Sequence, residues 1–202
     1  MSMRDIVGKA GVRLALVTYH FGTKEALFEE VVRRRWGVLD QNRRTALAAV
    51  SLHKNATIEM LLEAFMEPYL RMMLNGDPGW NNYGRMIARS NHSNRWLTIS
   101  SRYFDDTVRL FINELCKIVP RTPRLTLIRA FFLSVALMTH TFSQNRRIEH
   151  LSNGKIRADD YDKAYEDLIA YAAGGIRSLA ASASLTLGKQ ARRHLTKVRR
   201  SS

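Results

Sequence analysis

The sequence predicts an all-α protein in which a small N-terminal helix-turn-helix domain precedes a larger helical domain. Three observations support this fold class. Apolar residues recur at spacings of three and four along most of the 202-residue chain, as they do on one face of an α-helix. No segment alternates apolar and polar residues over the length of a half-buried strand. Only four prolines occur, and three of them fall in predicted turns.

The N-terminal stretch over residues 2–27 predicts two short helices joined by a tight turn. A serine precedes the first of them, over residues 3–10, and is a good N-cap. Gly11 supplies the left-handed residue that ends this helix. A second helix is expected over residues 13–21, and a third begins at Lys24. Two short helices around a glycine turn form the helix-turn-helix pattern.

Longer amphipathic helices follow. The helix that begins at Lys24 is expected to continue towards residue 50 and to link the first two helices to the rest of the chain. Further helices are expected over residues 56–74, 80–89, 95–119, 124–147 and 159–181. The helix over 124–147 is apolar around most of its circumference, which predicts burial on more than one side. A core on one side and a second subunit on the other would bury it.

The chain is strongly basic, with 32 Lys and Arg against 18 Asp and Glu and a formal net charge of +14. This charge favours a polyanionic partner, with nucleic acid well ahead of a membrane surface. No apolar run approaches the roughly 20 residues needed to span a membrane, so no membrane partner is predicted. The single cysteine, Cys116, permits no intramolecular disulfide, which suits a reducing cytoplasm.

Groupings typical of catalytic and metal sites are not evident in the sequence. The six histidines are scattered, the acidic residues are unpaired, and no phosphate-binding loop stands out. We therefore expect neither an enzyme nor a cofactor or metal site.

Four short motifs follow one another near the N-terminus: MRDI, the AGV turn, YHF and KEALF. Together they resemble the DNA-binding segment of the TetR family of one-component repressors. The resemblance implies a homodimeric regulator of the bacterial cytoplasm, nucleoid-associated, that binds double-stranded operator DNA and is released by a small, largely apolar effector. It also implies a helix-turn-helix DNA-binding domain over residues 1–40 and a ligand-binding and dimerisation domain over 41–182. Residues 183–202 are expected to form a basic, flexible tail.

Carried over position by position, the resemblance implies which residues touch DNA. Arg4 occupies a position where a base edge is contacted, and an arginine can bind guanine N7 and O6 in bidentate fashion. Tyr19, His20 and Lys24 match phosphate-contacting positions. The predicted DNA-binding residues are Ser2, Arg4, Arg13, Leu14, Ala15, Leu16, Thr18, Tyr19, His20 and Lys24.

Two features depart from the family pattern. Leu14, Ala15 and Leu16 make the recognition face unusually apolar, which predicts contacts with thymine methyl groups. In the family a further helix precedes the helix-turn-helix, and we expect this first helix to be absent, through a start codon assigned too late or through a real truncation. The alternative function is therefore a truncated dimerisation and ligand-binding module with impaired operator binding.

The larger domain is expected to hold the effector and to form the dimer. Its C-terminal half, especially RLTLIRAFFLSVALMTHTF and LSNGKIRADDYDKAYEDLIAYAAGGI, more loosely resembles the PsrA-like fatty-acid-responsive branch, which points to a fatty acid or an acyl-CoA. The predicted pocket residues, each with plain core packing as its alternative, are Phe65, Met66, Tyr69, Trp80, Met86, Trp96, Tyr103, Phe104, Phe111, Met138 and His140. The predicted dimer contacts on the last two long helices are Leu125, Phe132, Val135, Phe142, Tyr165, Ala172 and Ile176.

Overall fold

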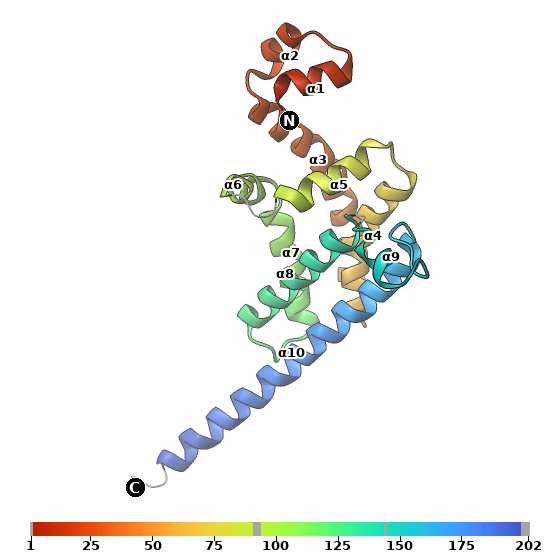
Figure 1. The fold of residues 1–202 in the computed structure, drawn as a ribbon. Helices are drawn as coiled ribbons and strands as arrows, with labels where there is room; N and C mark the ends of the chain where they lie inside the picture. The colour runs from red at the N-terminus through yellow and green to blue at the C-terminus, as the bar shows by residue number, and fades with distance from the viewer. Residues whose placement is uncertain (1, 91–93, 144, 199–202) are drawn as a thin grey trace.

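The computed structural model describes residues 2–90, 94–143 and 145–198, and the secondary structure of these residues is α-helical without strands (Figure 1). The described helices are α1 (Met3–Ala10), α2 (Leu14–Phe21), α3 (Lys24–Leu52), α4 (Ile58–Asn75), α5 (Gly79–Ser90), α6 (Asn94–Tyr103), α7 (Asp105–Ile118), α8 (Arg124–Thr141), α9 (Arg147–Leu151) and α10 (Tyr161–Val198). The predicted all-α fold with an N-terminal helix-turn-helix is confirmed.

Helices α1 and α2 form a small unit at one end of the molecule, and α3 connects it to the rest (Figure 1). Ser2 caps α1 reciprocally: its hydroxyl accepts from the Asp5 backbone N–H at 3.2 Å, and the Asp5 carboxylate accepts from the Ser2 N–H at 2.6 Å. Gly11 ends α1 in the left-handed region, with φ of 66°. Thr23 caps α3 by accepting from the Ala26 N–H at 3.1 Å. Local capping signals therefore set the ends of these short elements.

The larger domain is built around α4, which packs against α3, α7 and α10, while α8 packs along α10. Phe65 of α4 makes edge-to-face contacts with Phe111 of α7 and Phe131 of α8, at ring-centroid distances of 5.0 and 5.1 Å. All three rings are buried. This aromatic cluster joins α4, α7 and α8 in one core.

Several helix ends differ from the prediction. The helix expected over residues 95–119 is divided at Phe104 into α6 and α7. The helix expected over 124–147 ends at Thr141. The last helix continues to Val198, so the predicted tail is helical over most of its length. Its Ala- and Ser-rich start suggests fraying, but alanine has the highest helix propensity of all residues and sustains the helix.

Helix α3 runs without a break across the predicted domain boundary between residues 40 and 41. Its start lies beside α2, and it also packs against α4 and α7 in the larger domain. The residues buried along it are Val32, Trp36, Leu39, Arg43, Leu47 and Val50. One continuous helix therefore belongs to both domains.

Gly37 lies on the exposed side of α3, where an added Cβ would meet nothing within 4 Å. Glycine in a helix interior costs roughly 0.5–1 kcal/mol relative to alanine. Gly37→Ala should therefore raise the free energy of unfolding by about that amount, measured by chemical denaturation. Gly11→Ala is the contrasting control and should lower it, because φ at Gly11 is +66° and a side chain is strained there. A fall in stability for Gly37→Ala would contradict an open helix surface at this position.

Candidate DNA-binding surface and effector cavity

Helices α1 and α2 pack on each other through a small apolar contact. Val7 of α1 is buried, and Val17 and Phe21 of α2 are half-buried. The turn between the helices is closed by the Val12 backbone N–H, which donates to the Val7 carbonyl at 3.1 Å. The contact leaves most of the remaining side chains of α2 in solvent.

The predicted DNA-binding residues are nearly all solvent-exposed. Leu14 is half-buried, and the other nine are exposed. Tyr19 is 85% exposed, and its ring stands edge-to-face against that of His20 at 5.3 Å. These side chains are therefore available to a partner.

The charge of this surface suits the phosphates of DNA. Between Ile6 and Lys24 the sequence has Lys9, Arg13 and Lys24 but no acidic residue. The hydrogen bonds of the α1 cap engage the carboxylate of Asp5 and lower its pKa. Helix α3 begins at Lys24, and a helix N-terminus offers free backbone N–H groups to an anion. The surface can hold a phosphate backbone while α2 lies against a groove.

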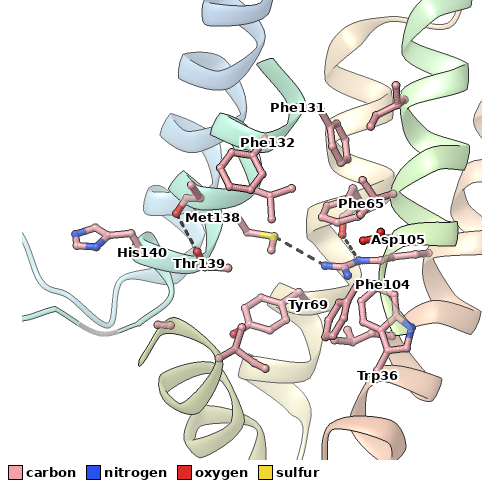
Figure 2. A pocket seen from close by; sticks show the side chains of 18 of the residues that line it. Trp36, Phe65, Tyr69, Phe104, Asp105, Phe131, Phe132, Met138, Thr139 and His140 are labelled. Carbon is pink, nitrogen blue, oxygen red and sulfur yellow. Dashed lines mark hydrogen bonds between the residues drawn. The ribbon is translucent and has the colours of Figure 1, made fainter. Parts of the chain in front are cut away.

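A cavity of about 790 Å³ lies in the larger domain, among α3, α4, α5, α6, α7 and α8 (Figure 2). Its volume falls within the ~300–1,000 Å³ typical of small-molecule sites. Most of its lining is apolar. The lining residues are Trp36, Leu39, Arg43, Phe65, Tyr69, Tyr83, Ile87, Ala88, Leu97, Phe104, Asp105, Val108, Ile112, Ile128, Phe131, Phe132, Val135, Ala136, Met138, Thr139 and His140.

The lining overlaps in part with the pocket residues predicted from the sequence. The predicted pocket residues that line the cavity are Phe65, Tyr69, Phe104, Met138 and His140. Those that do not are Met66, Trp80 and Phe111, which are buried in the core, and Met86 and Tyr103, which are half-buried. The side chain of Trp96 lies outside the described residues. Successive helical residues point about 100° apart, so Phe65 can face the cavity while Met66 faces the core.

Arg43 lines the cavity, although it was not among the predicted pocket residues. It follows Trp36 and Leu39 on the buried stripe of α3, and only 3% of it is exposed. Its Nε donates to the Phe65 carbonyl at 2.7 Å, and its guanidinium lies over the Phe65 ring, 3.8 Å from the centroid. Burial lowers the pKa of Arg43 to about 10, so the group stays charged at neutral pH. An arginine in the register of a core stripe is the sequence signal that could have identified it.

Two buried tyrosines add hydroxyl groups to the lining. Burial raises the pKa of Tyr69 on α4 and of Tyr83 on α5, so both stay protonated at neutral pH. Among the described residues, the Tyr83 hydroxyl has no hydrogen-bond partner. The Tyr69 hydroxyl lies directly against Gly84, where a Cβ would collide with it. The sequence pair Tyr83-Gly84 therefore supplies one hydroxyl and makes room for the other.

Exposed apolar side chains follow one face of α8. The predicted interface residues Leu125 and Phe132 are 74% and 71% exposed. Other exposed apolar residues of α8 are Ile128, Leu133 and Leu137, and those of α10 are Tyr171, Leu179 and Leu185. Extended apolar surface of this kind is typical of protein–protein or membrane contacts and of ligand-binding grooves.

The remaining predicted interface residues lie elsewhere. Phe142, Ala172 and Ile176 are buried in the core of the protomer itself, and their role as dimer contacts stays a prediction. Val135 and Tyr165 are half-buried, and Val135 lines the cavity together with Phe132. Helix α10 packs against α4 and α8 of its own chain, and this packing buries its apolar stripe.

The segment Tyr161–Leu185 of α10 is long and apolar enough to cross a membrane by length and composition alone. Its buried residues pack within the domain, and a packed core helix has the same composition. In the described part of the chain, no group of three or more His, Cys, Asp or Glu side chains could hold a metal ion.

Two separate segments of the sequence match known protein families. Residues 1–31 match the bacterial regulatory proteins of the tetR family, and residues 63–175 match the tetracyclin repressor-like C-terminal domain. No curated protein matches the sequence. The first match covers α1 and α2 with the start of α3, and the second covers most of the helices around the cavity. The chain therefore belongs to the TetR family of DNA-binding transcriptional regulators.

Proposed function

We propose that the protein is a homodimeric repressor that binds operator DNA through α1 and α2 and leaves it when a small, largely apolar effector occupies the cavity. The observation that carries this proposal is the position of α3. Its first turn borders the DNA-binding surface, and its middle supplies Trp36, Leu39 and Arg43 to the cavity. A ligand in the cavity thus touches the helix that positions α2. Proteins of this family are regulatory and generally not enzymes.

The exposed apolar face of α8, with the exposed residues of α10, supports the homodimer. Two-fold pairing through this face would bury Leu125 and Phe132, which are otherwise left in water. A symmetric dimer carries two helix-turn-helix units and binds two half-sites related by the same symmetry. The bound form would then be associated with the nucleoid.

The lining of the cavity supports an effector with a substantial apolar part, such as a fatty acid or an acyl-CoA of the kind that the PsrA-like branch binds. Aromatic and aliphatic side chains from six helices surround it. A flexible chain can fill a cavity of irregular shape with such walls.

A fluorescence anisotropy titration of the full chain tests the proposal. The duplexes tile the DNA upstream of its own gene, with a scrambled duplex as control, at two salt concentrations. One duplex should bind about a thousandfold more tightly than the scrambled one. Failure of every duplex to bind at low salt would favour a dimerisation and ligand-binding module instead.

Arg4 and Tyr19 should affect DNA binding differently. Tyr19→Ala removes a proposed phosphate contact, so affinity should fall by about tenfold for specific and scrambled duplexes alike. Arg4→Ala removes a proposed base contact, which is worth about 1–3 kcal/mol of discrimination, and should relax the preference at one base pair. The readout is anisotropy with a panel of single-base-pair operator variants. An equal loss on every member of the panel in Arg4→Ala would exclude the base-contact role.

A further inference from the structure

We propose that the cavity binds a monoanionic amphipathic ligand, whose carboxylate pairs with the guanidinium of Arg43 and accepts a hydrogen bond from the Tyr83 hydroxyl. The inference rests on the cavity as the effector site of the proposed function, and it adds the chemical class of the ligand. It also separates the two candidates above, because a free fatty acid carries a carboxylate and the acyl end of an acyl-CoA does not.

The first step is the unpaired charge of Arg43. Buried charged groups in proteins are normally paired, because removing a lone ion from water is costly. No carboxylate among the described residues forms a salt bridge with Arg43. The nearby carboxylate of Asp40 is held by Arg44 at 2.7 Å and by the hydroxyl of Thr107. The guanidinium is therefore a buried cation without an ion-pair partner in the described chain.

The second step is the hydrogen-bonding capacity that Arg43 retains. A guanidinium has five N–H donors. Nε donates to the Phe65 carbonyl at 2.7 Å, and Nη2 lies 4.0 Å from the sulfur of Met138, a weak acceptor (Figure 2, dashed lines). Stacking on Phe65 and Trp36, at 3.8 and 5.2 Å from the ring centroids, holds the group in place. The other donors remain for a ligand, and the fork geometry of arginine matches a carboxylate.

The third step is the unsatisfied hydroxyl of Tyr83. Buried hydroxyl groups almost always find a partner, so an orphaned one at a cavity wall indicates a missing acceptor. Tyr83 is 3% exposed, lines the same cavity as Arg43 and interacts electrostatically with it. Because the Tyr83 hydroxyl stays protonated, it can donate a hydrogen bond to an anionic ligand. Tyr69 lines the cavity beside it and supplies a second hydroxyl.

The remaining lining limits the ligand to one negative charge. Asp105 lines the cavity as well; its charge is offset by Arg109 at 3.6 Å, and what remains disfavours any negative charge on the ligand beyond the one that Arg43 neutralises. His140 lies at an exposed position, and its ring points away from the labelled aromatic side chains (Figure 2). A single buried cation balances a carboxylate, whereas a phosphate dianion would leave one charge uncompensated. The apolar walls then take the hydrocarbon part.

Isothermal titration calorimetry of the full chain, without DNA, tests the inference with dodecanoate, its methyl ester and dodecanoyl-CoA. Dodecanoate should bind about 10- to 100-fold more tightly than either ester. Arg43→Met should remove this advantage, because it should weaken dodecanoate binding by a much larger factor than binding of the methyl ester. Arg34→Met, at an exposed position of the same helix, is the matched control and should change neither affinity. Tyr83→Phe should reduce dodecanoate binding by a smaller factor.

Four results of the titrations would overturn the inference. Equal binding of dodecanoate and its ester, tighter binding of dodecanoyl-CoA, or no binding of any of them would show that the cavity does not select a carboxylate. An equal loss of both ligands in Arg43→Met would assign Arg43 a structural role. Thermal unfolding verifies that this variant folds, as expected when an unpaired buried charge is removed. If dodecanoate binds through Arg43 but leaves operator DNA bound, the ligand class stands and the repressor-release proposal fails.

Discussion

Leu125→Glu should convert the proposed dimer to a monomer and weaken binding to operator DNA by about 10²- to 10⁴-fold. The Leu125 side chain is 74% exposed on the apolar face of α8, outside the cavity lining. Two-fold pairing would place a glutamate against apolar surface or against its own symmetry mate, and both are unfavourable. A monomer then binds each half-site without the effective concentration that the second helix-turn-helix provides. Sedimentation velocity gives the oligomeric state, and anisotropy gives the affinity.

Leu52→Glu is the control for this variant. Leu52 is 86% exposed at the end of α3, away from α8 and α10 in sequence, and should tolerate the charge with the dimer intact. A Leu125→Glu protein that stays dimeric would place the interface elsewhere. A monomeric Leu125→Glu protein with unchanged operator affinity would show that pairing is not required for DNA binding.

Phe111→Ala should lower the free energy of unfolding by about 3–5 kcal/mol. Phe111 is fully buried, and its ring lies against those of Phe65 and Phe131 at centroid distances of 5.0 and 6.2 Å. Truncating Phe111 leaves a void that its packed aromatic neighbours cannot fill. It also removes the ring contacts that join α7 to α4 and α8. Denaturant titration followed by circular dichroism at one fixed protein concentration measures the loss.

Leu52→Ala provides the reference for that measurement and should stay within about 0.5 kcal/mol of the parent protein. A loss below about 1 kcal/mol in Phe111→Ala would mean that the aromatic cluster is not the centre of the core. Ligand added at saturation should raise the free energy of unfolding of Phe111→Ala and so recover part of the loss, because a ligand that binds only the folded state stabilises it.

The N-terminal elements could be predicted well because their signals are local. Ser2, Gly11 and Thr23 set helix ends through bonds to residues only a few positions away. The break between α6 and α7 at Phe104 has no such signal. The Phe104 ring packs at a tilt against that of Trp36 of α3, with the ring centroids 4.1 Å apart. Periodicity does not show such a contact between residues far apart in sequence. Tertiary packing, not local propensity, decides the structure there.

The candidate sites were only partly predictable for a related reason. A helical stripe shows that Ile176 and Phe142 are apolar, but not whether the covering surface belongs to the same chain or to a second one. Likewise Phe65 and Met66 differ by one helical step, and only the fold shows which of them meets the cavity. Arg43 was not predicted, although the sequence carries a signal for it: it interrupts an otherwise apolar stripe of α3. Charged residues at core positions therefore identify a site more reliably than apolar residues do.

Because α3 is unbroken, a small tilt of this helix beside the cavity would produce a larger displacement of its N-terminal end, next to the candidate DNA-binding surface. Arg43 lies nineteen positions after Lys24 along α3, which corresponds to about 29 Å at a rise of ~1.5 Å per residue. A rigid lever of that length turns a tilt of about 10° near Arg43 into a displacement of ~5 Å at its far end. Hydrogen bonds to bases and phosphates tolerate only a few tenths of an ångström. Release of DNA would thus need no unfolding, only a change of angle too small to disturb the packing around the ligand.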